Sequence, residues 1–398
     1  MLERAKQLLQ PSARSAVPPF MVMDVVAAAA RLEAQGRRII HMEVGQPAAG
    51  AAATAIAAAR AALTSPLRYT ETLGVTSLRQ RIARAYAEWH GLDIDPARIV
   101  VTTGSSAGFI LAFLAAFDAG DRVAVPLPGY PPYRHILTAL GGQPVGIKTD
   151  AATRWSITGE ALLAHHREKP LKGVIVASPS NPSGTMMSAS ALADVVHCAE
   201  DAGIVVISDE IYHRLEYAFA AETAARISDN TVVVNSFSKY FCMTGWRIGW
   251  MVVPPPMVRA IERLQQNLAI SVPTLSQIAA EAAFDGRAEL ENVRRGYEEN
   301  RQILLEELPR VGLDSFLPAD GAFYLYVDVS RFSNDSLAFA KRLLEEAGVA
   351  ITPGVDFDPL RGQNFVRLCY AGARADMREA VERIGDWLKK DTVRQAGR

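Results

Sequence analysis

The sequence predicts an α/β fold in which helices sandwich a large, mainly parallel sheet, and a smaller α/β domain completes the chain. Strand-like and helix-like segments alternate between residues 98 and 253, which is typical of parallel sheets. The chain has 398 residues, 49% of them hydrophobic, which is enough to fill two cores. Open α/β sheets bind ligands beyond the carboxyl ends of their strands. Small or polar residues follow four of the predicted strands there: Gly104, Asn181, Asp209 and Ser236.

Two helices and a strand are predicted before the alternating region. Residues 21–35 should form a helix that Gly36 ends, and residues 38–44 should form a short strand. Over residues 76–89, apolar side chains recur at helical spacing, which predicts an amphipathic helix.

The remaining elements suggest three regions along the chain. The predicted central elements are strands over 98–103, 122–128, 173–178, 204–208, 231–235 and 247–253, with a helix over 106–117. Helices then dominate to about residue 308, followed by strands over 323–329, 349–351 and 364–370 and helices over 335–347 and 374–390. We therefore expect an N-terminal arm that forms part of the small domain (1–45), a large domain (46–290) and a C-terminal small domain (291–398).

Composition and charge argue against several classes of function. The formal net charge is −1, which disfavours binding to nucleic acid or to a membrane surface through charge. No apolar run approaches the length of a membrane span, and no signal peptide is expected. Cys198, Cys242 and Cys369 are scattered and lack the spacing of a metal site. We expect no bound metal and a cytoplasmic location.

The stretch SFSKYFCMTGWRIGW, residues 236–250, carries the strongest chemical signal. It places Lys239 beside Ser236 and Ser238, and Arg247 follows eight residues later. A buried lysine is unusual unless it is paired or has a chemical role. Hydroxyl groups and an arginine fork suit a phosphate, and an amine suits an aldehyde, so the stretch predicts a pyridoxal phosphate site. The alternative is a surface Ser-Lys turn that leads into a strand.

A second phosphate-binding feature lies between the first central strand and its helix. The small residues Gly104, Ser105 and Ser106 connect them. A helix N-terminus offers free N–H groups and the positive end of the helix dipole, which suit an anion. An ordinary serine N-cap would have the same geometry, so the two interpretations are compatible.

From residue 45 to residue 370 the chain resembles the class I and II pyridoxal-phosphate aminotransferases, which are aspartate aminotransferase-like proteins of fold type I. The resemblance rests on the lysine loop, on RYTETLGVTSLRQRI (68–82), on the Asn-Pro-x-Gly turn at 181–184 and on Asp-x-x-Tyr at 209–212. It implies a large-domain sheet of the seven-stranded type, pyridoxal 5'-phosphate as cofactor, amino acid and 2-oxo acid substrates, and a homodimer with shared active sites.

The resemblance also implies three catalytic residues. Lys239 would form a Schiff base with the cofactor and move the substrate proton. Asp209 would hold the protonated ring nitrogen, and Tyr212 would donate to the ring oxygen. Glu210 is a rival to Asp209, whereas His213 is expected to be a packed or half-exposed side chain.

Cofactor-binding residues follow from the same motifs. Tyr130 would stack on the ring, with Tyr133 as a competitor, and Asn181 would bond the ring hydroxyl. Tyr69 would reach the phosphate of the cofactor that is bound in the neighbouring subunit. The remaining phosphate ligands would be Gly104, Ser105, Ser106, Ser236, Ser238 and Arg247.

The substrate carboxylate would be held by Gly45, Asn181 and Arg367. An arginine fork binds a carboxylate through two parallel hydrogen bonds. A structural salt bridge is the alternative for Arg367. Phe323 and Tyr324 lie in a family-like segment and are interpreted as core strand residues.

Two departures from the family pattern bear on the substrate. Gln46 replaces a residue that is often acidic, and alanines fill the stretch 48–62. Ser106 stands where some aspartate-type relatives carry a lysine that meets a side-chain carboxylate. We therefore expect a neutral or aromatic amino donor, with 2-oxoglutarate or pyruvate as acceptor. The alternatives are a pyridoxal-phosphate lyase or synthase, of the β-elimination or aminocyclopropane-carboxylate type, and a non-catalytic sensor of the cofactor.

Overall fold

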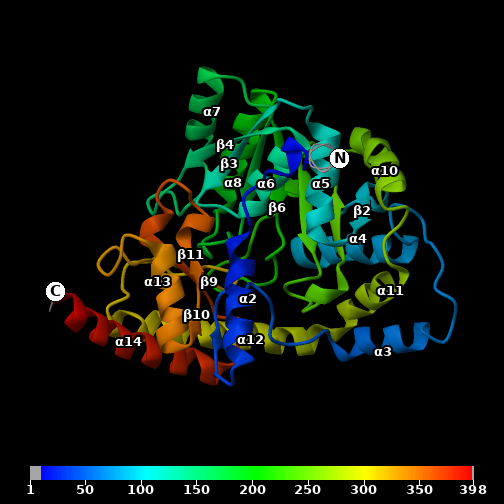
Figure 1. Ribbon diagram of the computed structural model, residues 1–398. Coiled ribbons are helices and arrows are strands. Elements are labelled where there is room, and N and C mark those ends of the chain that lie inside the picture. Colours follow the sequence, from blue (N-terminus) through cyan, green and yellow to red (C-terminus); the bar gives the residue numbers. More distant parts are fainter. Residues whose placement is uncertain (1–9, 397–398) are drawn as a thin grey trace, which may run out of the picture.

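The computed structural model describes residues 10–396, and a seven-stranded sheet is its largest element (Figure 1). Strand β8 runs antiparallel to both of its neighbours, and the other strands run parallel to one another. This confirms the predicted large, mainly parallel sheet. Across the sheet the strands are β2 (Ile99–Thr102), β8 (Gly249–Val252), β7 (Val232–Ser236), β6 (Val205–Asp209), β5 (Gly173–Ala177), β3 (Arg122–Leu127) and β4 (Gln143–Lys148).

Helices cover both faces of this sheet, which explains why its strands are apolar on both sides. Neighbouring residues of β2 show this directly, because Val100 belongs to one hydrophobic cluster and Val101 to another. Helix α5 packs against β7, β8 and α10. The helices of this part are α4 (Thr76–His90), α5 (Gly104–Ala116), α6 (Pro131–Leu140), α7 (Gly159–Glu168), α8 (Ala189–Asp201), α9 (Ala224–Ile227), α10 (Pro255–Leu268) and α11 (Thr274–Ala283).

A smaller unit combines the N-terminal segment with the C-terminal part of the chain. Strand β1 (Ile40–His41) pairs in parallel with β10 (Val349–Ala350). Beside them, β12 (Phe365–Cys369) lies between β11 (Thr352–Pro353) and β9 (Tyr324–Asp328) in an antiparallel sheet. Figure 1 shows α2 (Met21–Glu33), α13 (Ser336–Arg342) and α14 (Arg374–Ala396) around these strands.

The long helix α12 (Arg287–Glu307) runs along the lower edge of the view in Figure 1. The predicted boundary between residues 290 and 291 therefore falls inside a continuous helix. The alanine-rich stretch forms most of α3 (Ala53–Ala62), which packs against α11. Residues 1–9 of the predicted N-terminal arm lie outside the described residues.

Three local predictions need correction. Arg247 does not open a strand, because it follows a 3₁₀ turn (Thr244–Trp246) with a left-handed φ of 50°, and β8 begins two residues later. Within the predicted strand 38–44, only β1 (Ile40–His41) forms a strand. The predicted helix 335–347 ends in a π-helical turn (Leu343–Ala347). In addition, the edge strand β4 was not predicted from the sequence.

Within residues 10–396, none of the helices combines the length and the apolar character that a membrane span requires.

Candidate active site

The carboxyl ends of four parallel strands bring most of the predicted residues to one edge of the large sheet. Gly104 follows β2, Asn181 follows β5, Asp209 ends β6 and Ser236 ends β7. Parallel strands present these ends at the same edge, where α/β proteins bind ligands. Gly45 and Arg367 come from the smaller unit, so the site lies where the two parts of the chain meet.

Lys239 is the amine of this site. Its Nζ donates to the Gly45 carbonyl oxygen at 2.6 Å and lies 5.8 Å from the centre of the Tyr212 ring. Burial lowers the pKa of Lys239 to about 8, and the positive charges of Arg367 and Arg247 act in the same direction. A lysine with this pKa is partly neutral near physiological pH, so it can act as a nucleophile and as a base.

The start of α5 and the lysine loop form a site for an anion. Gly104 has a φ of 73°, and a Cβ there would lie 2.6 Å from Arg247 Nη2. Only glycine allows this approach of the guanidinium to the helix N-terminus. Ser236 Oγ accepts from the Ser238 backbone N–H at 3.0 Å, which fixes the turn before Lys239. The residues that offer hydrogen-bond donors to an anion here are Gly104, Ser105, Ser106, Ser236, Ser238 and Arg247.

Asp209 is a buried acid at the end of β6. Its Oδ2 accepts from the Tyr133 hydroxyl, and its Oδ1 accepts from the Ile211 backbone N–H at 3.2 Å. Burial raises the pKa of Asp209 to about 6, whereas the Tyr133 bond opposes this shift. The Tyr130 ring packs edge-on to Tyr133, with 5.3 Å between the ring centres. Tyr133 is therefore a ligand of Asp209 rather than a competitor of Tyr130.

Arg367 is a buried cation whose partners carry no charge. It is 2% exposed, and its Nη1 donates to Asn181 Oδ1 at 2.9 Å. Its Nη2 donates to the Glu43 carbonyl oxygen and, at 3.1 Å, to Thr352 Oγ1. Its Nε has no hydrogen-bond partner within residues 10–396. A buried guanidinium without a carboxylate is costly, so this site is suited to an anionic ligand.

Tyr324 is a buried core residue of β9, as predicted, and it also contacts residues of this site. Its hydroxyl forms a hydrogen bond with the Tyr212 hydroxyl at 2.8 Å. Its ring centre lies 4.5 Å from the Arg367 guanidinium carbon. A Cβ at Gly45 would lie 1.7 Å from the Tyr324 hydroxyl. Gly45 is therefore required by the close approach of this tyrosine.

Other site residues were missed because their roles depend on pairings between distant segments. Thr352 lies opposite Arg367 in the β11–β12 register, and Glu43 contributes only a backbone carbonyl. No local sequence signal marks either contact. The Tyr-x-x-Tyr spacing of Tyr130 and Tyr133 was visible, but it did not show which ring would reach Asp209.

Tyr69 lies apart from this cluster. Its side chain is 79% exposed, which is unusual for a tyrosine with a binding role in its own chain. Ser106 is exposed at the start of α5, where it could face either solvent or a ligand.

The residues present fit pyridoxal phosphate. The hydroxyls, the helix N-terminus and Arg247 suit its phosphate, Asp209 suits its ring nitrogen, and Lys239 suits its aldehyde. Arg367 adds a separate place for a carboxylate.

Comparison with known proteins agrees with this geometry. Residues 37–384 match the family model described as aminotransferase class I and II. The chain is 49% identical over 380 residues to the valine–pyruvate aminotransferase of Mycobacterium tuberculosis, which covers 94% of this chain and 97% of that protein. A crystal structure of an aminotransferase from Mycobacterium tuberculosis has a TM-score of 0.93 at 48% identity and covers 96% and 99% of the two chains. Aspartate aminotransferase from Thermus thermophilus has a TM-score of 0.89 at 31% identity, with 95% and 99% covered.

The contact between Gly45 and Tyr324 yields a first prediction. Gly45→Ala should destabilise the protein by about 1–3 kcal/mol, because the new methyl group overlaps the tyrosine. Thermal and urea unfolding would measure the change. Gly50→Ala is the matched control, since nothing lies within 4 Å of a Cβ there.

Tyr324→Phe removes the closest atom and should recover part of the stability of Gly45→Ala in the double variant. The predicted overlap between the new methyl group and Tyr324 would be contradicted by either of two results. One is an equal loss of stability in Gly45→Ala and Gly50→Ala, and the other is strict additivity of the stability changes of Gly45→Ala and Tyr324→Phe.

Proposed function

Because the chain belongs to the class I and II aminotransferase family and is a transaminase, we propose that it moves the amino group of a neutral L-amino acid to a 2-oxo acid, with pyridoxal phosphate bound at Lys239. One observation carries this proposal. The Glu43 carbonyl accepts from Arg367, and the Gly45 carbonyl accepts from Lys239. A short segment thus holds a carboxylate-binding guanidinium next to a reactive amine, as an α-amino acid requires.

The side-chain preference follows from the surroundings of the lysine loop. A cavity next to this loop is lined by uncharged residues, among them Gln46, Ala49, Cys242, Thr244, Trp246 and Ser276. Ser106 provides no cation for a second carboxylate. The relative that is named for valine and pyruvate also supports a neutral donor and pyruvate as acceptor. We propose 2-oxoglutarate as the alternative acceptor. An aromatic donor remains within the proposed class.

Arg367 and Asn181 orient the substrate. The substrate carboxylate would replace neutral hydrogen-bond acceptors of the Arg367 guanidinium, and its negative charge would compensate the buried positive charge of Arg367. Asn181 Oδ1 already accepts from Arg367 Nη1, so it holds the fork in place. The substrate Cα would then lie between this fork and the amine of Lys239.

Lys239 Nζ removes the proton from Cα of the amino acid. A pKa lowered to about 8 by burial makes the neutral amine available without a strong external base. When bound, pyridoxal phosphate supplies an electrophilic aldehyde and a ring that delocalises the electron pair left at Cα. Asp209 would stabilise a positive charge at the ring nitrogen, and Tyr212 would donate to the ring oxygen.

Several residues would hold the cofactor without taking part in proton transfer. Tyr130 would pack on its ring. The phosphate would be held by Gly104, Ser105, Ser106, Ser236, Ser238 and Arg247. Asn181 would bond both the ring hydroxyl and the substrate carboxylate.

The exposed Tyr69 supports a homodimer with shared active sites. Thr72 Oγ1 donates to the Ile270 carbonyl at 3.1 Å, which joins the Tyr69 loop to the end of α10. Ile270 is 51% exposed with a left-handed φ of 63°, a strained conformation for a β-branched residue. Leu268 is exposed on the same segment. A second copy of the chain would cover these apolar groups.

The division into regions 1–45, 46–290 and 291–398 and a cytoplasmic location are also proposed. The three cysteines, which all lie within the described residues, form no disulfide, and this supports a reducing compartment. Fractionation of cells that produce the protein would test the location.

Lys239 should be the residue that captures the cofactor. Incubation with pyridoxal phosphate, reduction with borohydride and peptide mass spectrometry should place the added mass on Lys239. Capture should accelerate as the pH rises toward about 8, because only the neutral amine attacks the aldehyde. Lys239→Ala should lose this label and all turnover, whereas the exposed Lys172→Ala should lose neither. Turnover in Lys239→Ala would overturn the assignment.

Arg367→Ala should raise KM for every amino donor on the order of tenfold to a hundredfold, because a charge-assisted fork is lost. Steady-state kinetics with several neutral amino acids would measure the change. The KM of Arg367→Lys should lie between those of the wild type and of Arg367→Ala, since lysine keeps the charge but lacks the fork. The exposed Arg374→Ala is the control. An unchanged KM with unchanged cofactor capture would place the carboxylate elsewhere.

Hybrid dimers test whether Tyr69 serves the neighbouring subunit. Chains with Lys239→Ala and chains with Tyr69→Ala, mixed under conditions that exchange subunits, should form hybrids that contain one intact site. Random exchange should restore about a quarter of the sites to wild-type cofactor affinity, as expected for a two-fold dimer. No gain on mixing would show that Tyr69 acts within its own chain or not at all.

A further inference from the structure

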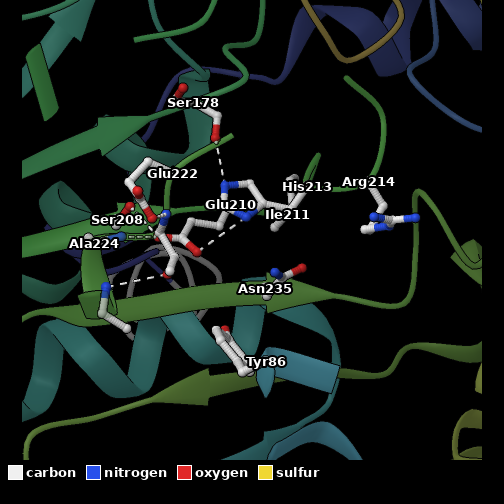
Figure 2. Close-up of polar contacts among 12 residues, drawn as sticks. Tyr86, Ser178, Ser208, Glu210, Ile211, His213, Arg214, Glu222, Ala224 and Asn235 are labelled. Carbon is white, nitrogen blue, oxygen red and sulfur yellow. Dashed lines mark hydrogen bonds and ion pairs between the residues drawn. The ribbon is translucent and has the colours of Figure 1, made fainter. Parts of the chain in front are cut away.

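A buried carboxyl group and a buried imidazole lie behind the proposed site, and the proposed mechanism uses neither. Glu210 is 1% exposed and His213 is 3% exposed. Glu210 follows the last residue of β6, and its carboxyl group bonds Ser208 and Ala224, whereas that of Asp209 bonds Tyr133 and Ile211. Figure 2 shows the two side chains facing each other, with His213 linked on its other side to Ser178.

Hydrogen bonding fixes the tautomer of His213. Its Nε2 lies 3.2 Å from the Ser178 carbonyl oxygen, which can only accept, so Nε2 carries the proton. Its Nδ1 faces Glu210 Oε2 at 3.5 Å. Neither of these two atoms has a hydrogen-bond partner within residues 10–396. Two bare acceptors would repel each other, so one proton must lie between them.

The other carboxyl oxygen of Glu210 is already satisfied. Oε1 accepts from the Ala224 backbone N–H at 2.8 Å and from Ser208 Oγ at 3.1 Å. These bonds orient the carboxyl group so that only Oε2 is directed at the imidazole. The shared proton is therefore confined to the contact with His213.

The surroundings favour a neutral pair over an ion pair. Burial raises the pKa of Glu210 to about 7 and lowers the pKa of His213. His90 lies 5.5 Å from His213 between ring centres, and burial lowers its pKa to about 4, so it contributes no charge at neutral pH. The other titratable or charged groups that act on this cluster are Tyr86, Asp209, Glu216, Glu222 and Arg226.

We propose that Glu210 and His213 share one proton between Oε2 and Nδ1, and that this pair positions the Asp209–Tyr212 turn against the loop that carries Asn181. The proposal rests on the proposed function, because it gives the pair the task of holding those residues. Glu210 and His213 are positioning residues, since their polar contacts are to each other and to Ser178, Ser208 and Ala224 rather than to Lys239 or Arg367.

The contacts of the pair show how it would act. His213 Nε2 bonds the carbonyl of Ser178, from which the chain continues to Asn181. Glu210 and His213 flank Tyr212 in the sequence, so the turn that carries this tyrosine is held at both ends. The shared proton also keeps a second negative charge away from Asp209, whose pKa an ionised Glu210 would raise.

Substitution of Glu210 tests whether its hydrogen bonds position the site. Glu210→Gln places an amide N–H where the acid proton would be and an oxygen where Ala224 and Ser208 donate. For a neutral pair it should keep kcat within about threefold of the wild type, because every hydrogen bond is retained. Glu210→Ala should lower kcat on the order of tenfold to a hundredfold through misplaced groups.

Infrared spectroscopy provides a readout that does not depend on turnover. The wild-type protein should show the carbonyl band of a buried carboxylic acid at neutral pH, and Glu210→Gln should lack it. The band should persist in Lys239→Ala, which removes the proposed function but leaves the pair intact. Failure of the proposed function would therefore not be mistaken for failure of this proposal.

Three outcomes decide the proposal. An acid band lost in Glu210→Gln, with near-normal kcat in Glu210→Gln and a large loss in Glu210→Ala, would support it. Absence of the band in the wild type would overturn the shared proton. Equal and small effects of both substitutions on kcat and on cofactor affinity would overturn the positioning role. His213→Ala should reproduce the loss seen in Glu210→Ala, since the link to Ser178 disappears with the imidazole.

Discussion

The buried positive charge of Arg367 constrains the arrangement of the whole site. A guanidinium removed from water without a carboxylate partner is unfavourable, and among residues 10–396 its hydrogen bonds go only to neutral oxygens of Asn181, Glu43 and Thr352. These groups come from the large sheet, the N-terminal segment and the small antiparallel sheet. The cation therefore binds three distant parts of the chain together and leaves a charge that a substrate carboxylate can neutralise.

The same segment that holds this cation also holds the amine. Lys239 and Arg367 bond carbonyls two residues apart, so their positive charges are close enough to oppose each other. Burial and this repulsion both favour the neutral lysine, whose pKa falls to about 8. Gly45 must approach closely to make this arrangement, and the Tyr324 hydroxyl excludes any side chain there. The proposed carboxylate recognition and the proposed activation of the base thus both depend on a single turn of the backbone.

The sequence allowed the edge of the sheet to be predicted, because strand ends and helix N-termini follow local rules. Asp209, Asn181 and Ser236 lie where the alternation of strands and helices placed them. Thr352 and Tyr324 could not be found this way, since their contacts arise from the β11–β12–β9 register and from a close approach across the fold. Arg247 was placed in a strand because RIGWMVV is apolar, although its own backbone is left-handed. The edge strand β4 was missed because Pro144 and Gly146 weaken its strand pattern.

Asp209 and Glu210 illustrate how adjacent acids acquire different surroundings. The sequence offered them as rivals, but Asp209 ends β6 and bonds Tyr133, whereas Glu210 lies just beyond the strand and bonds Ser208 and Ala224. Both are buried, and two adjacent carboxylates in a low dielectric cannot both remain charged without strong partners. Asp209 receives hydrogen bonds from Tyr133 and Ile211 that favour its ionised form, whereas Glu210 faces an imidazole nitrogen with no proton of its own. The hydrogen bonds from Tyr133 and Ile211 therefore favour the ionised form of the acid that faces the proposed cofactor.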